Sequence, residues 1–174
     1  VPYGLVQLGP SSIPQEWDWT SGYHISDSTV IGFPHMHLSG TGIGDLHDIT
    51  LMPVVGEVKY ARGVESDQTS GLWSYSDRSK EVVKPGYYAT HLLRYNVDVE
   101  LTATKRVGFH KYTFNQKENA VVVFDLQNGG CWDSPTKAYI NKVDDKTIEG
   151  YRYSSGWAND QRVFFVAEFS EPIT

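Results

Sequence analysis

Strict alternation of apolar and polar residues constrains the fold of this chain more than any other feature. Between residues 96 and 104 every second residue is apolar, and these residues are Val97, Val99, Leu101 and Ala103. Side chains of an extended backbone point to opposite faces in turn, so this stretch is typical of a half-buried strand. Similar signals predict further strands over residues 3–8, 28–33, 48–52, 54–60, 87–94, 107–114, 120–126, 137–143, 147–153 and 162–169.

Helical periodicity is missing, because no stretch of a dozen residues keeps an apolar stripe at helical spacing. Parallel βαβ units are therefore disfavoured, and antiparallel sheets packed face to face are the natural solution. Asp144-Asp145 is typical of a hairpin tip, and Asn128-Gly129-Gly130 of a wide loop. We expect an all-β chain, an antiparallel two-sheet β-sandwich of the supersandwich kind with very little helix.

Length and composition limit the possible functions. The 174 residues suit one domain over residues 1–174, and 40% hydrophobic with 21% charged residues is typical of a globular chain. Apolar runs stay far below the roughly 20 residues of a membrane-spanning helix, so no membrane-spanning segment is expected. A net charge of −6 without a block of Lys or Arg argues against nucleic acid as a partner. The single Cys131 excludes an internal disulfide.

Two loop segments, residues 14–27 and 32–48, break the strand rhythm with Trp, His, Gly and acidic residues. Such loops on a β scaffold commonly carry function. The pair His35 and His37 could share a face and hold a metal ion, or it could hydrogen-bond to sugar hydroxyls or to neighbouring backbone. A dinucleotide-binding interpretation of Gly40, Gly42 and Gly44 fails, because Asp45 stands where the third glycine of that motif belongs.

Trp17 and Trp19 lie two residues apart and would share a face of an extended backbone. Their rings could stack on the apolar face of a sugar, or they could be a core pair. Neighbouring polar residues make the sugar-binding interpretation as strong as the packing one.

The same two loops carry a family resemblance. The stretch WDWTSGYHISDSTVIGFPHMHLSGTGIGDLHDITLMP is similar to the N-terminal domain of glycoside hydrolase family 92, the exo-acting α-mannosidases. The resemblance extends over nearly the whole chain, through VPYGLVQLGP, KPGYYATHL, VELTATKRVGFHKYTF and GWANDQRVFFVAEFSEP.

This resemblance implies a β-sandwich packed against a larger C-terminal (α/α)₆ barrel, with calcium-dependent, inverting hydrolysis of α-mannosides between the two domains. The catalytic acid and base and most calcium ligands would belong to that barrel, so neither catalytic nor metal-ligating residues are expected in this chain. Its expected partners are mannose-containing glycans and the C-terminal catalytic domain of the same polypeptide. The expected location is secreted, periplasmic or at the cell surface.

The loops of this chain would wall the sugar site. The resemblance implies substrate-binding roles for Trp17, Asp18, Trp19, Tyr23, His24, Asp27, His35, His37, Thr41, Gly42 and Asp45. Ser39 and Gly40 belong to the same matching loop. Two alternatives stay open, namely a stand-alone lectin-like module and a metal-dependent oxygenase built on His35 and His37.

Overall fold

The computed structural model of the chain describes residues 4–13, 22–37, 46–128 and 133–174. With 48% of residues in strands and 2% in helix, it confirms the all-β sandwich class. The strands are β1 Thr29–Val30, β2 Phe33–Pro34, β3 Thr50–Val55, β4 Ser74–Tyr75, β5 Val82–Lys84, β6 Tyr87–Leu92, β7 Val97–Ala103, β8 Gly108–Phe114, β9 Ala120–Asp125, β10 Ser134–Lys142, β11 Thr147–Ser155 and β12 Gln161–Glu168. A single 3₁₀ turn, η2 Arg78–Lys80, is the helical element of the described part.

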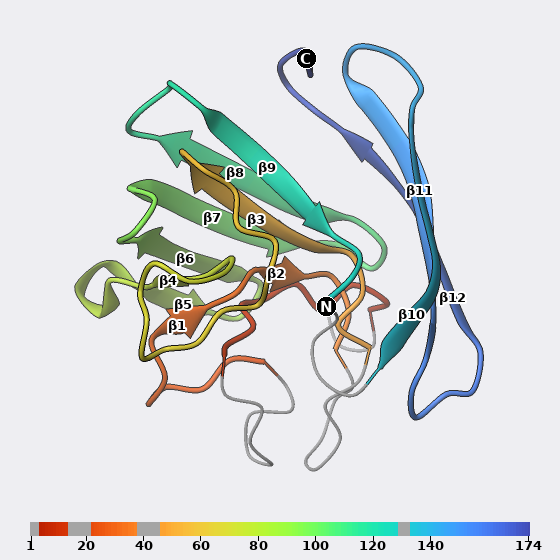
Figure 1. Ribbon diagram of the computed structural model, residues 1–174, viewed down its shortest axis with the longest axis horizontal. Coiled ribbons are helices and arrows are strands. Elements are labelled where there is room, and N and C mark those ends of the chain that lie inside the picture. Colours follow the sequence, from red (N-terminus) through yellow and green to blue (C-terminus); the bar gives the residue numbers. More distant parts are fainter. Residues whose placement is uncertain (1–3, 14–21, 38–45, 129–132) are drawn as a thin grey trace.

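Antiparallel pairing joins these strands into sheets (Figure 1). Among the described residues the orders are β2-β3-β9, β5-β6-β7-β8, β10-β11-β12 and the short pair β1-β4. The β2-β3-β9 sheet is central, because the four-stranded sheet packs on one of its faces and the three-stranded sheet lies along its other side (Figure 1).

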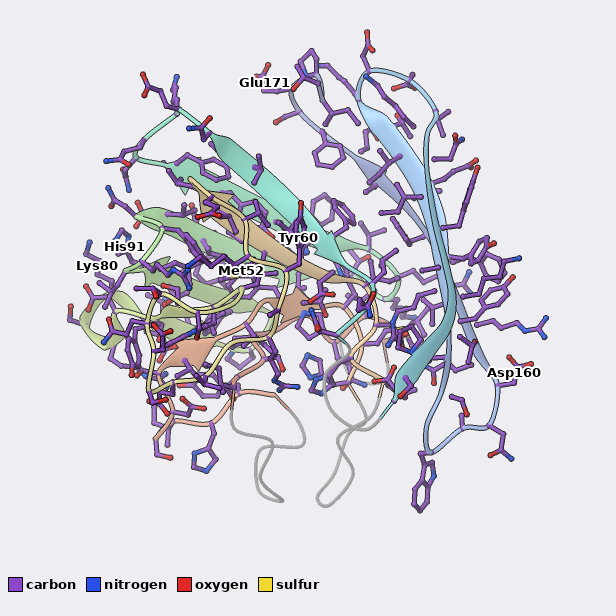
Figure 2. All side chains as sticks on the ribbon, in the orientation of Figure 1. Met52, Tyr60, Lys80, His91, Asp160 and Glu171 are labelled. Atoms are coloured by element: carbon purple, nitrogen blue, oxygen red, sulfur yellow. The ribbon has the colours of Figure 1, made fainter. Side chains whose placement is uncertain are left out.

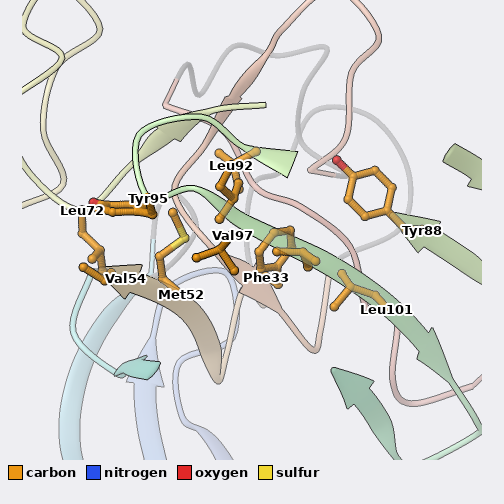
Figure 3. Close-up of a cluster of buried hydrophobic side chains, with 11 residues drawn as sticks. Phe33, Met52, Val54, Leu72, Tyr88, Leu92, Tyr95, Val97 and Leu101 are labelled. Carbon is orange, nitrogen blue, oxygen red and sulfur yellow. The ribbon is translucent and has the colours of Figure 1, made fainter. Parts of the chain in front are cut away.

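The main core lies between the central sheet and the four-stranded sheet (Figure 3). Phe33, Met52 and Val54 project from the central sheet and meet Val97 and Leu101 of β7. The alternation of β7 therefore behaves as predicted, since its apolar residues are buried and the residues between them point outward.

Strand β3 is buried on both faces, which explains a misplaced prediction. Its Leu51 belongs to a second apolar cluster with Ile49 and Leu126, whereas Met52 belongs to the main core. A strand buried on both faces has a continuous apolar run instead of alternation. The two strands predicted over residues 48–52 and 54–60 are thus wrong. A single strand covers Thr50–Val55.

Proline is compatible with this strand. β2 covers only Thr50 and Leu51, so β3 is an edge strand on that side at Pro53. An edge is where the missing N–H of proline is tolerated.

The three-stranded sheet packs on the central sheet through a smaller contact. Val163 and Phe165 of β12 lie against the second cluster, and the rings of Phe165 and Phe124 stack at 5.8 Å. A Cβ at Gly150 would lie 2.8 Å from the Phe165 ring, so this inward position of β11 leaves room for the ring.

The prediction over residues 3–8 is wrong for its described part, since residues 4–8 form no strand. Leu5 and Gln7 donate backbone hydrogen bonds to two different segments, at Lys105 and His35. The strand predicted over 28–33 is broken at Gly32, whose φ is +147°.

The sequence missed β4 and β5, because two or three residues show no periodicity. The remaining predicted strands and the hairpin at Asp144-Asp145 are confirmed. Within the described residues, no helix is long and apolar enough to cross a membrane.

Candidate functional site

Gly22 and His37 bring the two predicted loop segments together. Gly22 directly follows the undescribed residues 14–21, and His37 directly precedes the undescribed residues 38–45. A Cβ at Gly22 would lie 2.5 Å from His37 Cε1, and φ at Gly22 is +94°. Only glycine combines that conformation with so close an approach. The two segments on which the family resemblance rests therefore share one contact in the fold.

His37 is a buried and polar side chain of this contact. It is 7% exposed, and neither ring nitrogen makes a hydrogen bond within the described residues. Its ring lies 4.7 Å from that of His47, centroid to centroid. Burial, together with the nearby His47, lowers the pKa of His37 to about 3. His37 is therefore a neutral imidazole at physiological pH.

His47 connects this histidine pair to the start of the chain. Its Nδ1 lies 3.3 Å from the hydroxyl oxygen of Ser11, which is also buried. The Ser11 backbone in turn pairs with Gly32. His47 of the second loop segment is thus in contact with His37 and with Ser11.

A second histidine pair joins the central sheet to the four-stranded sheet. His35 Nδ1 lies 2.7 Å from the Ile49 carbonyl oxygen, and His35 Nε2 lies 3.0 Å from His110 Nε2. The carbonyl only accepts, so His35 Nδ1 carries the proton and the neutral ring accepts from His110 Nε2–H. His110 Nδ1 then accepts from the Tyr112 hydroxyl at 2.7 Å.

Each member of this chain has one consistent protonation state. Burial lowers the pKa of His110 to about 3, with His35 contributing, and burial also lowers the pKa of His35. Burial raises the pKa of the Tyr112 hydroxyl. The sequence signal for this pair is Gly108, where a Cβ would lie 2.6 Å from His35 Cδ2.

Arg152 of β11 anchors the three-stranded sheet beside these histidines. Its side chain is 1% exposed, its Nη1 lies 2.5 Å from Asp48 Oδ1, and it also contacts Asp133. Its Nε donates to the Leu126 carbonyl oxygen at 2.9 Å. Gln161 donates to the other oxygen of Asp48. The cation therefore ties β11 to Asp48 and Asp133, which follow the undescribed residues 38–45 and 129–132.

Burial and ion pairing compete in this cluster. Burial acts to lower the pKa of Arg152, but Asp133 and Asp48 outweigh it and raise the pKa. Burial raises the pKa of Asp48 against the opposing effect of Arg152, and Asp133 adds to the rise. Two carboxyl groups share one cation here, so the removal of Arg152 would leave them without a counter-charge.

These residues do not fit a calcium or transition-metal site. No group of three or more His, Cys, Asp or Glu side chains gathers within the part of the chain that the structure describes. Asp48 and Asp133 are bound to Arg152, and both ring nitrogens of His35 bond within the protein.

The remaining described candidates have hydrogen-bond partners outside the two histidine pairs. The hydroxyl of Tyr23 donates to Glu81 at 3.1 Å, and Glu81 also accepts from Tyr88 and Arg78. Asp27 accepts from the backbone and hydroxyl of Thr29 and so fixes the turn before β1. His24 Nδ1 lies 2.7 Å from the Ser26 hydroxyl oxygen.

All other predicted site residues fall outside the described residues. These are Trp17, Asp18, Trp19, Ser39, Gly40, Thr41, Gly42 and Asp45. Sequence reasoning missed the roles of His47, His110, Arg152 and Asp133. For Arg152 a signal was available, since it shares the inward face of β11 with Ile148 and Gly150.

Comparison with known proteins gives a consistent result over the whole chain. The N-terminal domain of glycosyl hydrolase family 92 matches residues 1–174. A solved family 92 α-mannosidase from Bacteroides thetaiotaomicron is 35% identical, with a TM-score of 0.93, and its structure with mannoimidazole matches equally well. A second family 92 glycosyl hydrolase, 22% identical over 98% of this chain and 23% of its own, has the same fold, with a TM-score of 0.77.

The chain spans only part of these proteins. The match to the Bacteroides enzyme covers 100% of this chain and 23% of that one. Among curated proteins none matches the chain.

Proposed function

Since the chain belongs to glycoside hydrolase family 92 as its N-terminal domain, we propose that it shapes the substrate site of an exo-acting α-mannosidase and holds the catalytic domain in place. The observation that carries the proposal is the match to a solved α-mannosidase over the full length of this chain. The substrates in this proposal are α-mannosides of glycans.

The anchored loop bases support a site-shaping role. Gly22 packs on His37 of the second loop segment, and Arg152 binds Asp48 at the end of that segment and Asp133 after one further loop. Side chains held by packing and by buried ion pairs lose little further entropy when a ligand binds. The loops of the two matching segments would therefore meet a sugar from a rigid base.

In this proposal the chemistry comes from the remainder of the polypeptide. Inverting hydrolysis requires a carboxylic acid and a carboxylate base about 6.5–9.5 Å apart, with a water molecule between the base and the sugar. Asp48 and Asp133 are engaged by Arg152 and suit neither role. The calcium ion expected for the complete enzyme would likewise be bound mainly by the larger domain.

Trp19 is the residue through which we test the sugar contact. A ring stacked on a sugar contributes roughly 0.5–1.5 kcal/mol beyond its buried area and also positions the glycosidic bond. In the complete enzyme, Trp19→Ala should lower kcat/KM for an aryl α-mannoside by about one to three powers of ten. Its melting temperature should change little.

Trp73 provides the matched control, because this tryptophan is 1% exposed. Trp73→Ala should cost about 3–5 kcal/mol of stability and lower the melting temperature, with kcat/KM per folded molecule retained. If Trp19→Ala instead leaves kcat/KM unchanged and strongly lowers the melting temperature, Trp19 is a core residue and the proposed sugar contact is wrong.

A further inference from the structure

The outward face of the three-stranded sheet carries an exposed apolar cluster. We call it the aromatic face, and it consists of Tyr139, Tyr151, Tyr153, Phe164 and Val166. Strand register places Tyr139, Tyr151 and Phe164 in one row across β10, β11 and β12. Phe164 is 66% exposed, Val166 71% and Tyr139 48%. Adjacent exposed apolar side chains of this kind mark an interaction surface.

The rings of this face meet at mixed angles. Tyr151 stacks nearly parallel on Tyr139, at 5.5 Å and 22°, and on Tyr153, at 4.6 Å and 27°. Phe164 stands steeply against this row, 5.9 Å from Tyr151 at 59° and 5.8 Å from Tyr153 at 72° between ring planes. The Phe164 ring therefore makes the surface uneven, which suits interdigitating side chains of a protein partner. The face is edged by two cations, Lys137 over Tyr151 and Arg162 over Tyr153. Aromatic residues at the centre and charges at the rim are the usual composition of a protein interface.

The opposite face of the same sheet is apolar as well. Ile148 is buried there, and Val163 and Phe165 pack on the second cluster. A sheet that is apolar on both faces is typical of an inner layer, covered on both sides. The described residues cover one side only, with the central sheet (Figure 2).

We propose that the aromatic face is the docking surface for the larger remainder of the family 92 polypeptide. The inference rests on the proposed function, which makes this chain one domain of a larger enzyme. The occupant follows from size, because the chain corresponds to 23% of its solved α-mannosidase relative and the greater part of such a protein is available to cover the face.

Cysteine labelling of the complete enzyme tests this proposal. Phe164→Cys places a thiol on the aromatic face, and Phe109→Cys places one on the outward face of β8. Phe109 is a matched control, since it is 55% exposed against 66% for Phe164. Maleimide modification at each position is followed by peptide mass spectrometry, so that the native Cys131 does not interfere. Val166→Cys repeats the test at a second position in case Phe164→Cys fails to fold.

The expected result is that the thiol at position 164 reacts at least about tenfold more slowly than the thiol at 109 in the native enzyme, and equally fast after denaturation. Equal native rates would overturn the proposal, and so would protection of both positions alike. Protection that disappears on dilution would assign the face to a second copy of the chain. Protection that requires added mannan would assign it to a glycan. Both of these outcomes overturn the proposed occupant.

Labelling and activity are separate readouts. An enzyme that leaves aryl α-mannosides intact but protects position 164 would contradict the proposed function while the docking surface stands. An active enzyme whose position 164 is labelled as fast as position 109 would contradict the docking surface and leave the proposed function standing.

Discussion

The two sheets that flank the central β2-β3-β9 sheet differ in what they present to the outside. The outward face of the four-stranded sheet is mainly polar, with Lys111 bound to Glu100 at 2.6 Å and His91 bound to Asp98 at 2.6 Å. The outward face of the three-stranded sheet is the aromatic face. In Figure 2, His91 and Asp160 mark these two flanks on opposite sides of Met52.

The flanks also differ in how they attach to the centre. The four-stranded sheet shares a continuous apolar core with it, whereas the three-stranded sheet has a smaller apolar cluster and the buried ion pairs of Arg152. The first flank is complete as an outer layer, with its core inside and water outside. The second has apolar side chains on both faces, which supports the proposed docking surface.

Loss of Arg152 should produce the largest effect, because it breaks the polar attachment of the three-stranded sheet. Arg152→Met leaves Asp48 and Asp133 buried without a counter-charge, which costs about 3–5 kcal/mol. For a domain of this size the melting temperature should fall by about 6–20 °C. Thermal unfolding of the complete polypeptide measures this shift.

Lys142 of β10 supplies the control on the same sheet, since it lies away from the aromatic face and pairs with Asp145 at an exposed site. Lys142→Met should leave the melting temperature unchanged within error. Similar losses for both variants would mean that the buried ion pairs do not hold the sheet.

Acid should weaken both histidine pairs, His37 with His47 at the second loop segment and His35 with His110 at the four-stranded sheet. The pKa values of His37 and His110 are lowered to about 3 and that of His35 is also lowered, whereas an unfolded histidine titrates near 6.5. Between these values the unfolded chain binds protons that the folded chain does not, so stability is complete above pH 6.5 and declines as the pH falls. The slope is about 1.4 kcal/mol per pH unit for each histidine.

Denaturant unfolding between pH 7 and pH 4 measures this slope, and His37→Phe isolates one contribution. Because the His37 nitrogens make no hydrogen bond within the described residues, the variant should fold and have a slope lower by about 1.4 kcal/mol per pH unit. Burial raises the pKa of Asp48, which acts in the opposite direction and is the same in both proteins. Identical slopes would show that His37 is not neutral in the fold.

The smallest effect is expected on the polar outward face. Glu100 accepts from Lys111 and from the hydroxyl of Tyr87 at an exposed position. Lys111→Ala should leave the melting temperature of the complete enzyme within error of the unchanged protein, because exposed ion pairs are screened by water and salt. A clear fall in the melting temperature would indicate that the outward face of the four-stranded sheet is also covered. The contrast between the two flanks would then disappear.

The sequence predicted β6 to β12, through alternation in strands such as β7 and through runs rich in β-branched and aromatic residues in strands such as β9 and β12. Alternation failed at β3, where Leu51 and Met52 are both buried on opposite faces, and at β4 and β5, which are too short for a period to show. The apolar outward face of the β10-β11-β12 sheet was not predicted, because an outer strand is expected to have polar residues on its outward face.

The sequence predicted which two segments contribute to the candidate site, but it did not predict most of the contacts that these residues make. Glycine is required at positions 22 and 108 because a Cβ there would collide with the rings of His37 and His35, which lie elsewhere in the sequence. Arg152 pairs with Asp48 across 104 residues. Partners so distant in sequence follow from sheet packing, which local patterns do not encode. Arg152 on the inward face of a predicted strand nevertheless indicates a buried ion pair.

The activity of the chain by itself tests most directly whether this domain is one part of a larger α-mannosidase. The purified 174-residue chain is incubated with an aryl α-mannoside and calcium, beside the complete enzyme. Turnover is expected from the complete enzyme and not from the chain alone, because the proposed function assigns the catalytic acid and base to the remainder of the polypeptide. Turnover by the chain alone that is abolished by Asp18→Asn or Asp45→Asn would contradict it.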